Sequence, residues 1–551
     1  MARKVRKKTR RKKTRRGGRS RSLVPRSRLP EGGPLAELAA RLGERPTPHE
    51  LAILADPAHQ LGFLPWGLRE RLAALWTPTK VAALSTEEIC TLLASWGVTV
   101  DRESFVALAR GRERAWAIAE EIWLPPARER GEVPDNLLGL AAVELWKRWI
   151  PERPGRDVLG SWVAEGYRLL EHDRNAACEH WLRTWDTLRW RLGLRPTLAA
   201  AREMVDGGPE LTRWLLDLGW ELCVAVAGSP ALGPRAVAYL EATARLQLPQ
   251  GEAWVRHCLR TDLADVLFHI GRREEGERVH RTLIRGPGSA LERRRLAEAL
   301  AYSADVCSAE ELERATALLE VVPDYGVGLG EEAEAHDRLA CLQEHPPLEP
   351  APPVARLAQV GMYLPTILEE RILAASDAVV PELLALVEQG IEAEDESRGQ
   401  WAAVHAVKLL GERHDARVVE PAVRFLGSCA PDWNAANHAV GGLGRLGRAG
   451  LEPLLAAHAA ATDPYIRRAL REAVAELDLN DPRILELLVR GLDESPGWAA
   501  LDLLQHNDER AIPFIQRRLD QGCDEGDARS LEHALEELQG LDDEDTAPVW
   551  A

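Results

Sequence analysis

The spacing of apolar residues is the property of this sequence that most restricts its fold. From Pro34 onward, apolar residues recur every three or four positions, and no convincing run alternates between apolar and polar residues. This spacing predicts one amphipathic helix after another. Ser85 and Glu88 have the spacing of a capping box, and Gly97 follows as a helix stop. We therefore expect an all-α chain.

Two helix pairs in the middle of the sequence share a pattern of small and large residues. The first pair places its characteristic residues on the two sides of a turn at Gly271, namely Leu263, Ala264 and Leu267 before it and Gly276, His280 and Leu283 after it. Small residues at such positions let two helices approach closely, and large ones fill the groove between them. The next pair repeats the pattern loosely and closes at Pro323, so we expect degenerate repeats.

This pattern matches that of tetratricopeptide (TPR) repeats. Four segments resemble the TPR-like helical region of bacterial proteins that often carry an SEC-C zinc motif, namely residues 84–109, 167–188, 211–228 and 260–284. The resemblance covers roughly residues 84–325 and implies a helical-repeat fold. The SEC-C cysteine cluster is absent at both ends of the sequence, so no zinc role carries over to this chain.

A second kind of repeat follows a Pro-rich segment. Four first helices with their turns recur at intervals of 33, 34 and 27 residues, at 406–417, 439–450, 473–483 and 500–510. Each leads into a second helix, and Pro421, Pro453 and Pro513 fall in the first turn of three of them, where a missing N–H costs nothing. This part resembles a HEAT-repeat array, which implies stacked helix pairs and says almost nothing about a ligand.

The expected fold is an α-solenoid of degenerate TPR-like helix pairs followed by HEAT-like repeats. We divide the chain into a disordered basic tail (1–33), an N-terminal helical region (34–150), TPR-like repeats (151–344), a Pro-rich linker (345–353), HEAT-like repeats (354–541) and an acidic tail (542–551). Five prolines stiffen the linker.

The basic tail is the strongest candidate for a binding function. It has thirteen basic residues within positions 3–21, namely Arg3, Lys4, Arg6, Lys7, Lys8, Arg10, Arg11, Lys12, Lys13, Arg15, Arg16, Arg19 and Arg21. Residues 31–551 carry 55 basic and 86 acidic residues, so a basic arm precedes an acidic body. Such a run is disordered alone and can hold RNA or DNA nonspecifically, since no aromatic residue interleaves it for base stacking.

Three other interpretations of the tail stay open. It can contact an anionic membrane, remain solvated, or dock on the acidic body near residues 541–550.

Tryptophan is unusually common, with 18 residues against five Phe and six Tyr. Trp181 and Trp185 share one helical face because they are four positions apart. They can fill the core between paired helices, or line an aromatic groove that holds a partner peptide. Trp214 and Trp254 admit the same two interpretations.

The sequence contains no pattern typical of catalysis or metal binding. Eight scattered cysteines without a CxxC pair predict a reducing compartment and no disulfides. No HExxH, phosphate loop or nucleophile elbow is present, so we expect no cofactor and no enzyme. His269 and His280 flank the turn at Gly271 and would need partners from elsewhere to form a site, so we interpret them as ordinary polar histidines.

The leading hypothesis is a non-enzymatic scaffold or adaptor that binds protein partners through its solenoid grooves. The alternative is a nucleic-acid- or ribosome-associated factor that uses the basic tail for nonspecific polyanion contact. The sequence shows neither a signal peptide nor a transmembrane segment, which predicts a cytoplasmic protein.

Overall fold

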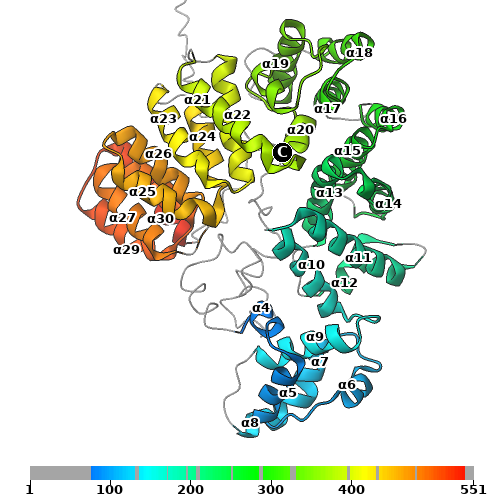
Figure 1. Ribbon diagram of the computed structural model, residues 1–551. Helices are drawn as coiled ribbons and strands as arrows, with labels where there is room; N and C mark the ends of the chain where they lie inside the picture. The colour runs from blue at the N-terminus through cyan, green and yellow to red at the C-terminus, as the bar shows by residue number, and fades with distance from the viewer. Residues whose placement is uncertain are drawn as a thin grey trace, which may run out of the picture.

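The computed structural model describes residues 76–539, apart from short gaps at 131–135, 171, 194–195, 207–210, 250–251, 285–288, 323–329, 394–396, 430–433, 478 and 480. In this part of the chain every regular element is a helix, and the β-type contact between Thr197 and Gln247 is an isolated bridge. Neighbouring helices pack in pairs along the chain (Figure 1). The all-α prediction is confirmed, and the arrangement is consistent with an α-solenoid. The tails at 1–33 and 542–551 lie outside the described residues.

The N-terminal helices form a unit with its own core. They are α4 (Pro78–Ala82), α5 (Thr86–Ser95), α6 (Arg102–Ala109), α7 (Ala115–Ile118), α8 (Leu124–Arg130) and α9 (Leu137–Trp149), with a π-helical turn at Ala119–Trp123. The predicted capping box at α5 is confirmed, because Glu88 N donates to Ser85 Oγ at 3.1 Å and Ser85 N donates to Glu88 Oε2 at 2.7 Å. Buried apolar residues between positions 81 and 158 form one cluster around Phe105, Trp116 and Trp146.

The middle of the chain is a series of longer helices. They are α10 (Arg156–Leu170), α11 (Arg174–Leu192), α12 (Leu198–Met204), α13 (Leu211–Gly228), α14 (Gly233–Ala244), α15 (Ala253–His269), α16 (Arg273–Leu283), α17 (Ser289–Tyr302), α18 (Ala309–Glu320) and α19 (Glu331–Glu344). A Cβ atom at Gly166 on α10 would overlap the Trp181 ring on α11, so glycine is what lets these helices approach. Trp181 Nε1 donates to Val163 O at 2.8 Å across the same contact.

The C-terminal half contains helices α20 to α30. They are α20 (Thr366–Ala374), α21 (Val380–Ile391), α22 (Arg398–Glu412), α23 (Val419–Ser428), α24 (Asn434–Gly444), α25 (Leu451–Ala460), α26 (Pro464–Ala475), α27 (Pro482–Glu494), α28 (Pro496–His506), α29 (Ile512–Asp520) and α30 (Glu525–Gln539). The first helices α22, α24, α26 and α28 pack successively on one another, and α30 closes the row. Figure 1 shows these pairs stacked in one block, in yellow to red. None of the described helices combines the length and apolarity needed to cross a membrane.

The turns between first and second helices in the C-terminal half repeat one contact. Asp415 Oδ1 accepts hydrogen bonds from Arg417 N at 3.1 Å and Nε at 2.9 Å. Asp481 holds Arg483 in the same way, and so does Asp508 with Arg510. In the intervening turn, Gly447 takes a positive φ of 55° instead. Three of these four turns therefore share an Asp-X-Arg contact.

The Pro-rich segment at 345–353 lies against the protein. Cys307 N donates to Pro347 O at 2.9 Å, and Ala351 N donates to Asp305 O at 3.2 Å. The segment ends in a 3₁₀ turn at Val354–Gln359 whose Val354 and Leu357 are buried. A single apolar cluster runs from residue 224 to residue 538, so the core is continuous across this segment.

Candidate functional site

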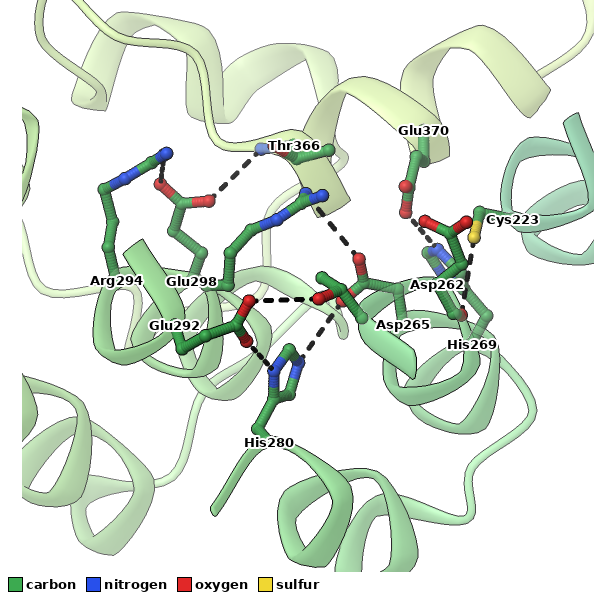
Figure 2. A network of polar contacts seen from close by, with 12 residues as sticks. Cys223, Asp262, Asp265, His269, His280, Glu292, Arg294, Glu298, Thr366 and Glu370 are labelled. Carbon is green, nitrogen blue, oxygen red and sulfur yellow. Dashed lines mark hydrogen bonds and ion pairs between the residues drawn. The ribbon is translucent and has the colours of Figure 1, made fainter. Parts of the chain in front are cut away.

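A cluster of buried ionisable side chains lies where α20 meets α13, α15 and α17 (Figure 2). We call it the joint cluster, and its members are Asp262, Asp265, His269, His280, Glu292, Arg295 and Glu370. Charged groups are costly to bury unless they are paired and hydrogen-bonded. Seven such groups in one place therefore set this region apart from the rest of the apolar core.

His280 stands between two carboxylates. Its Nδ1 lies 3.1 Å from Glu292 Oε2, and its Nε2 lies 3.5 Å from Asp265 Oδ1 (Figure 2). The His280 side chain is fully buried, as are the two carboxyl groups. Burial alone would lower the pKa of His280, but its contacts with Asp265 and Glu292 outweigh that effect and raise the pKa to about 8.

Glu292 also collects contacts from α15. Its Oε1 accepts a hydrogen bond from Thr261 Oγ1 at 3.0 Å and lies 2.8 Å from His257 Nε2. Although burial acts to raise the pKa of Glu292, its contact with His280 brings it below the usual range. Glu292 is therefore an anion that helps to join α15, α16 and α17.

His269 and Glu370 connect α15 directly to α20. His269 Nε2 lies 2.7 Å from Glu370 Oε2, and the two side chains are 2% and 1% exposed. Burial raises the pKa of Glu370 to about 7, although the hydrogen bond with His269 opposes the shift. The carboxyl group of Glu370 is thus close to its titration point at neutral pH.

Asp262 and Cys223 complete the side of the cluster next to α13. Asp262 packs against Gly219, where a Cβ atom would overlap its carboxyl group, and Cys223 Sγ lies 3.5 Å from Asp262 O. Burial raises the pKa of Asp262 well above its usual value; Arg295 opposes this shift, whereas Asp265 and Glu370 add to it. Burial likewise raises the pKa of the Cys223 thiol, so it is an unreactive apolar group.

A neighbouring set of ion pairs links α17, α19 and α20. Glu298 Oε1 lies 2.9 Å from Arg294 Nη1 and 3.3 Å from Arg338 Nε, and Glu298 Oε2 accepts a hydrogen bond from Thr366 N at 3.3 Å. Although burial acts to raise the pKa of Glu298, Arg294 and Arg338 hold it below its usual range. This carboxylate therefore ties the N-terminus of α20 to α17.

The joint cluster is built to hold helices together. Its imidazole and carboxyl groups contact each other and are buried between the helices. The described residues contain no group of three or more His, Cys, Asp or Glu placed to hold a metal ion. The chemistry that this geometry offers is proton uptake and release within a helix junction.

The spacing around the turn at Gly271 draws attention to His269 and His280 but does not identify their partners. The structure supplies these partners from other helices, Glu370 on α20 and Glu292 on α17. A detectable sign was the run TDLADVLFH at 261–269, which puts two aspartates among the apolar residues of a helix expected to be buried. Acidic residues are almost never fully buried unless they are paired.

The other predicted site residues have different outcomes. All thirteen basic residues of the tail lie outside the described part of the chain. Trp181, Trp185 and Trp214 are buried in the core, at 0%, 2% and 0% exposure, while Trp254 is 53% exposed at the start of α15. Of the four predicted groove residues, Trp254 alone can meet a partner in this arrangement.

An open groove of about 840 Å³ lies between the second helices α23 and α25. Its floor consists largely of small and β-branched side chains, namely Val419, Val423, Ala456, Ala457, Ala460, Ala461 and Ile466. Arg417, Glu420 and Arg424 line it from the α23 side, and Asp463 lies at the start of α26. This groove is open to solvent and lies beside exposed charged side chains of Arg417 and Arg424.

Comparison of the chain with protein-family models, with curated proteins and with solved structures gives no match.

Proposed function

We propose that the chain is a non-enzymatic helical-repeat scaffold, and that the groove between α23 and α25 holds an amphipathic helix of a partner protein. The observation that supports this proposal most is the composition of α25. Between Glu452 and Asp463 no residue carries a fixed charge. A surface helix ordinarily presents a polar face to water, whereas the exposed residues of α25 after Glu452 are alanines.

The equivalent helix of the next unit provides the contrast. On α27, the exposed face carries Arg483, Glu486 and Arg490, whose side chains are 47%, 61% and 73% exposed. On α25, Glu452 is exposed and charged, but the exposed residues that line the groove, Ala456 and Ala460, carry no charge. An apolar outer face on one helix of an otherwise charged row is typical of a surface covered by a partner.

The shape of the groove favours a helix with large aliphatic residues. Alanines along α25 allow a second helix backbone to approach closely and leave hollows that Leu or Ile side chains would fill. Arg417 and Arg424 on the α23 side have side chains 63% and 52% exposed. They favour a partner helix with acidic residues along that edge, because ion pairs between the two proteins fix the orientation of the bound helix.

Substitutions in α25 test this proposal. Ala457→Arg fills the groove with a charged side chain, whereas Ala459→Arg places the same side chain on the same helix outside the groove lining. We expect affinity capture from the host cell to lose a specific partner with Ala457→Arg, by at least tenfold, and to keep it with Ala459→Arg. Equal capture by the two variants would contradict the groove as the docking site, provided that both retain the wild-type melting temperature.

Polyanion contact through the basic tail is the second candidate function. The feature that favours it is the run of thirteen basic residues in positions 3–21, beside a body in which acidic residues outnumber basic ones. Binding of single-stranded RNA should then weaken steeply with salt and be indifferent to sequence. Removal of residues 2–28 should abolish it; unchanged affinity after this deletion would exclude the tail as the binding element.

A further inference from the structure

We propose that the contact of α20 with α13, α15 and α17 is a pH-sensitive joint, which is tight in mildly acidic conditions and loosens as the pH rises toward 8. This inference is independent of which partner the scaffold binds. It concerns how firmly the TPR-like helices are held to the helix pairs that follow them.

Two carboxyl groups hold α20 against α15 and α17. Glu370 contacts His269 of α15 at 2.7 Å, and Glu298 of α17 accepts a hydrogen bond from Thr366 N at the first residue of α20. The α13 side is packed closely, because a Cβ atom at Gly228 would come within 2.8 Å of Ala374 O. Loss of the Glu370 contact therefore weakens the hold of α15 on the middle of α20, while the contacts at its two ends remain.

The ionisable groups that act on Glu370 or pack against α20 come from four helices. They are Cys223 of α13, Asp262, Asp265 and His269 of α15, Arg295 and Glu298 of α17, and Lys408 and Arg413 of α22. Several of the cations are already engaged elsewhere. Lys408 Nζ lies 2.7 Å from Glu369, and Arg413 Nη1 donates to the carbonyl oxygens of Leu373 and Ala375.

The carboxyl groups of the joint cluster outnumber its permanent cations. Arg295 is the guanidinium that acts on Asp262, Asp265, Glu292 and Glu370 together. Its Nη1 lies 3.6 Å from Asp265 Oδ2, so its closest contact is with that carboxylate. The remaining negative charge is offset by protons on the imidazole and carboxyl groups. When the pH rises and these protons leave, uncompensated anions remain buried between the helices, which destabilises the closed joint.

The direction of the effect follows from linkage. The pKa of Glu370 rises from 4.5 to about 7 in the closed joint, and that of His280 rises from 6.5 to about 8. A group with a raised pKa stabilises the closed state fully below its ordinary pKa, and this stabilisation is lost as the pH rises through the raised value. The pH range over which stabilisation is lost is 4.5 to about 7 for Glu370 and 6.5 to about 8 for His280. A rise in pH through these ranges therefore weakens the joint through both groups.

The other acids act at lower pH. The pKa values of Asp265, Glu292 and Glu298 fall below their usual range, because the neighbouring positive charges outweigh burial. Their contribution is present above the ordinary pKa of a carboxyl group and is lost as the pH falls through the lowered value. The joint is therefore tightest in mildly acidic conditions, above the pH at which Asp265, Glu292 and Glu298 take up protons and below the pH at which Glu370 and His280 lose theirs.

Hydrogen exchange of the full-length chain tests the proposal. Amide exchange in peptides from α20 is followed by mass spectrometry at pH 6 and pH 8, with the intrinsic pH dependence of exchange divided out. The expected result is that protection of α20 falls by about tenfold between these pH values, because the closed state loses the proton of Glu370. Equal protection at both pH values overturns the proposal, and this measurement needs no variant.

Two variants on the same helix identify the group responsible. Glu370→Gln keeps a polar partner for His269 but cannot titrate, so we expect the pH dependence of α20 protection to shrink to the part that His280 contributes. Glu369→Gln is the matched control, because Glu369 contacts Lys408 on the α22 side, and it should keep the full pH dependence. If Glu370→Gln retains the wild-type pH dependence, Glu370 is not the switch and the proposal fails.

Discussion

His269 and Glu370 are 101 residues apart in sequence, yet their Nε2 and Oε2 atoms lie 2.7 Å apart inside the protein. This contact crosses from α15 to α20, the first α-helix after the Pro-rich segment. The segment itself is held against the protein, and one apolar cluster continues past it. The two parts of the solenoid are thus joined by a polar contact set inside a shared core.

Removal of His269 should destabilise this junction. We expect His269→Ala to lower the free energy of unfolding by about 3 kcal/mol, because Glu370 then stays buried without its partner. Urea denaturation followed by circular dichroism measures the loss. In a double-mutant cycle with Glu370→Ala, a coupling energy of about 2 kcal/mol is expected; additive losses would mean that the two residues contribute separately.

His405 should make α22 sensitive to acid, the opposite of the joint. Burial lowers its pKa to about 3, although the contact of its Nε2 with Gly361 O at 2.9 Å opposes the shift. A base with a lowered pKa stabilises the fold above its ordinary value of 6.5, and this stabilisation decreases as the pH falls toward 3. Hydrogen exchange should therefore show weaker protection of α22 at pH 4.5 than at pH 7. A His405→Gln variant that keeps the same acid sensitivity would rule out this cause.

Two tryptophans from the predicted groove set should respond very differently to substitution. Trp214 is fully buried, so Trp214→Ala should cost about 4 kcal/mol through lost burial and a cavity. Trp254 is 53% exposed, and Trp254→Ala should change the free energy of unfolding by less than about 1 kcal/mol. Chemical denaturation of both variants measures the difference. If Trp214→Ala and Trp254→Ala lower the free energy of unfolding by similar amounts, the N-terminal end of α15 is covered in solution.

Helix positions and turns were predictable from the sequence, whereas contacts between distant helices were not. Ser85 and Glu88 act within one turn, and the prolines at 421, 453 and 513 act through their own backbone, so local pattern was enough. Helical periodicity says which residues share a face but not which helix covers it. It could not decide whether Trp181 and Trp185 face a partner or the core, and it could not pair His269 with Glu370.

The close contact between α22 and α24 permits a sharp test of the C-terminal stacking. A Cβ atom at Gly411 would overlap the carbonyl oxygen of Gly442, so the two backbones touch. Gly411→Ala must push α22 and α24 apart, and we expect it to lower the free energy of unfolding by about 2 kcal/mol. The loss should appear in the melting temperature of the purified full-length chain.

Gly441 is the matched control for this substitution, because it lies on α24 beside Gly442 but has room for a Cβ atom. A Cβ atom there would meet Glu476 Oε2 at 3.7 Å, an ordinary van der Waals distance. Gly441→Ala should stabilise the helix by up to about 1 kcal/mol through the higher helix propensity of alanine. The two alanine variants therefore have opposite expected signs, since only one of them adds an atom where the helices meet. If Gly411→Ala and Gly441→Ala destabilise the protein equally, close packing of α22 against α24 is not the reason for glycine at position 411.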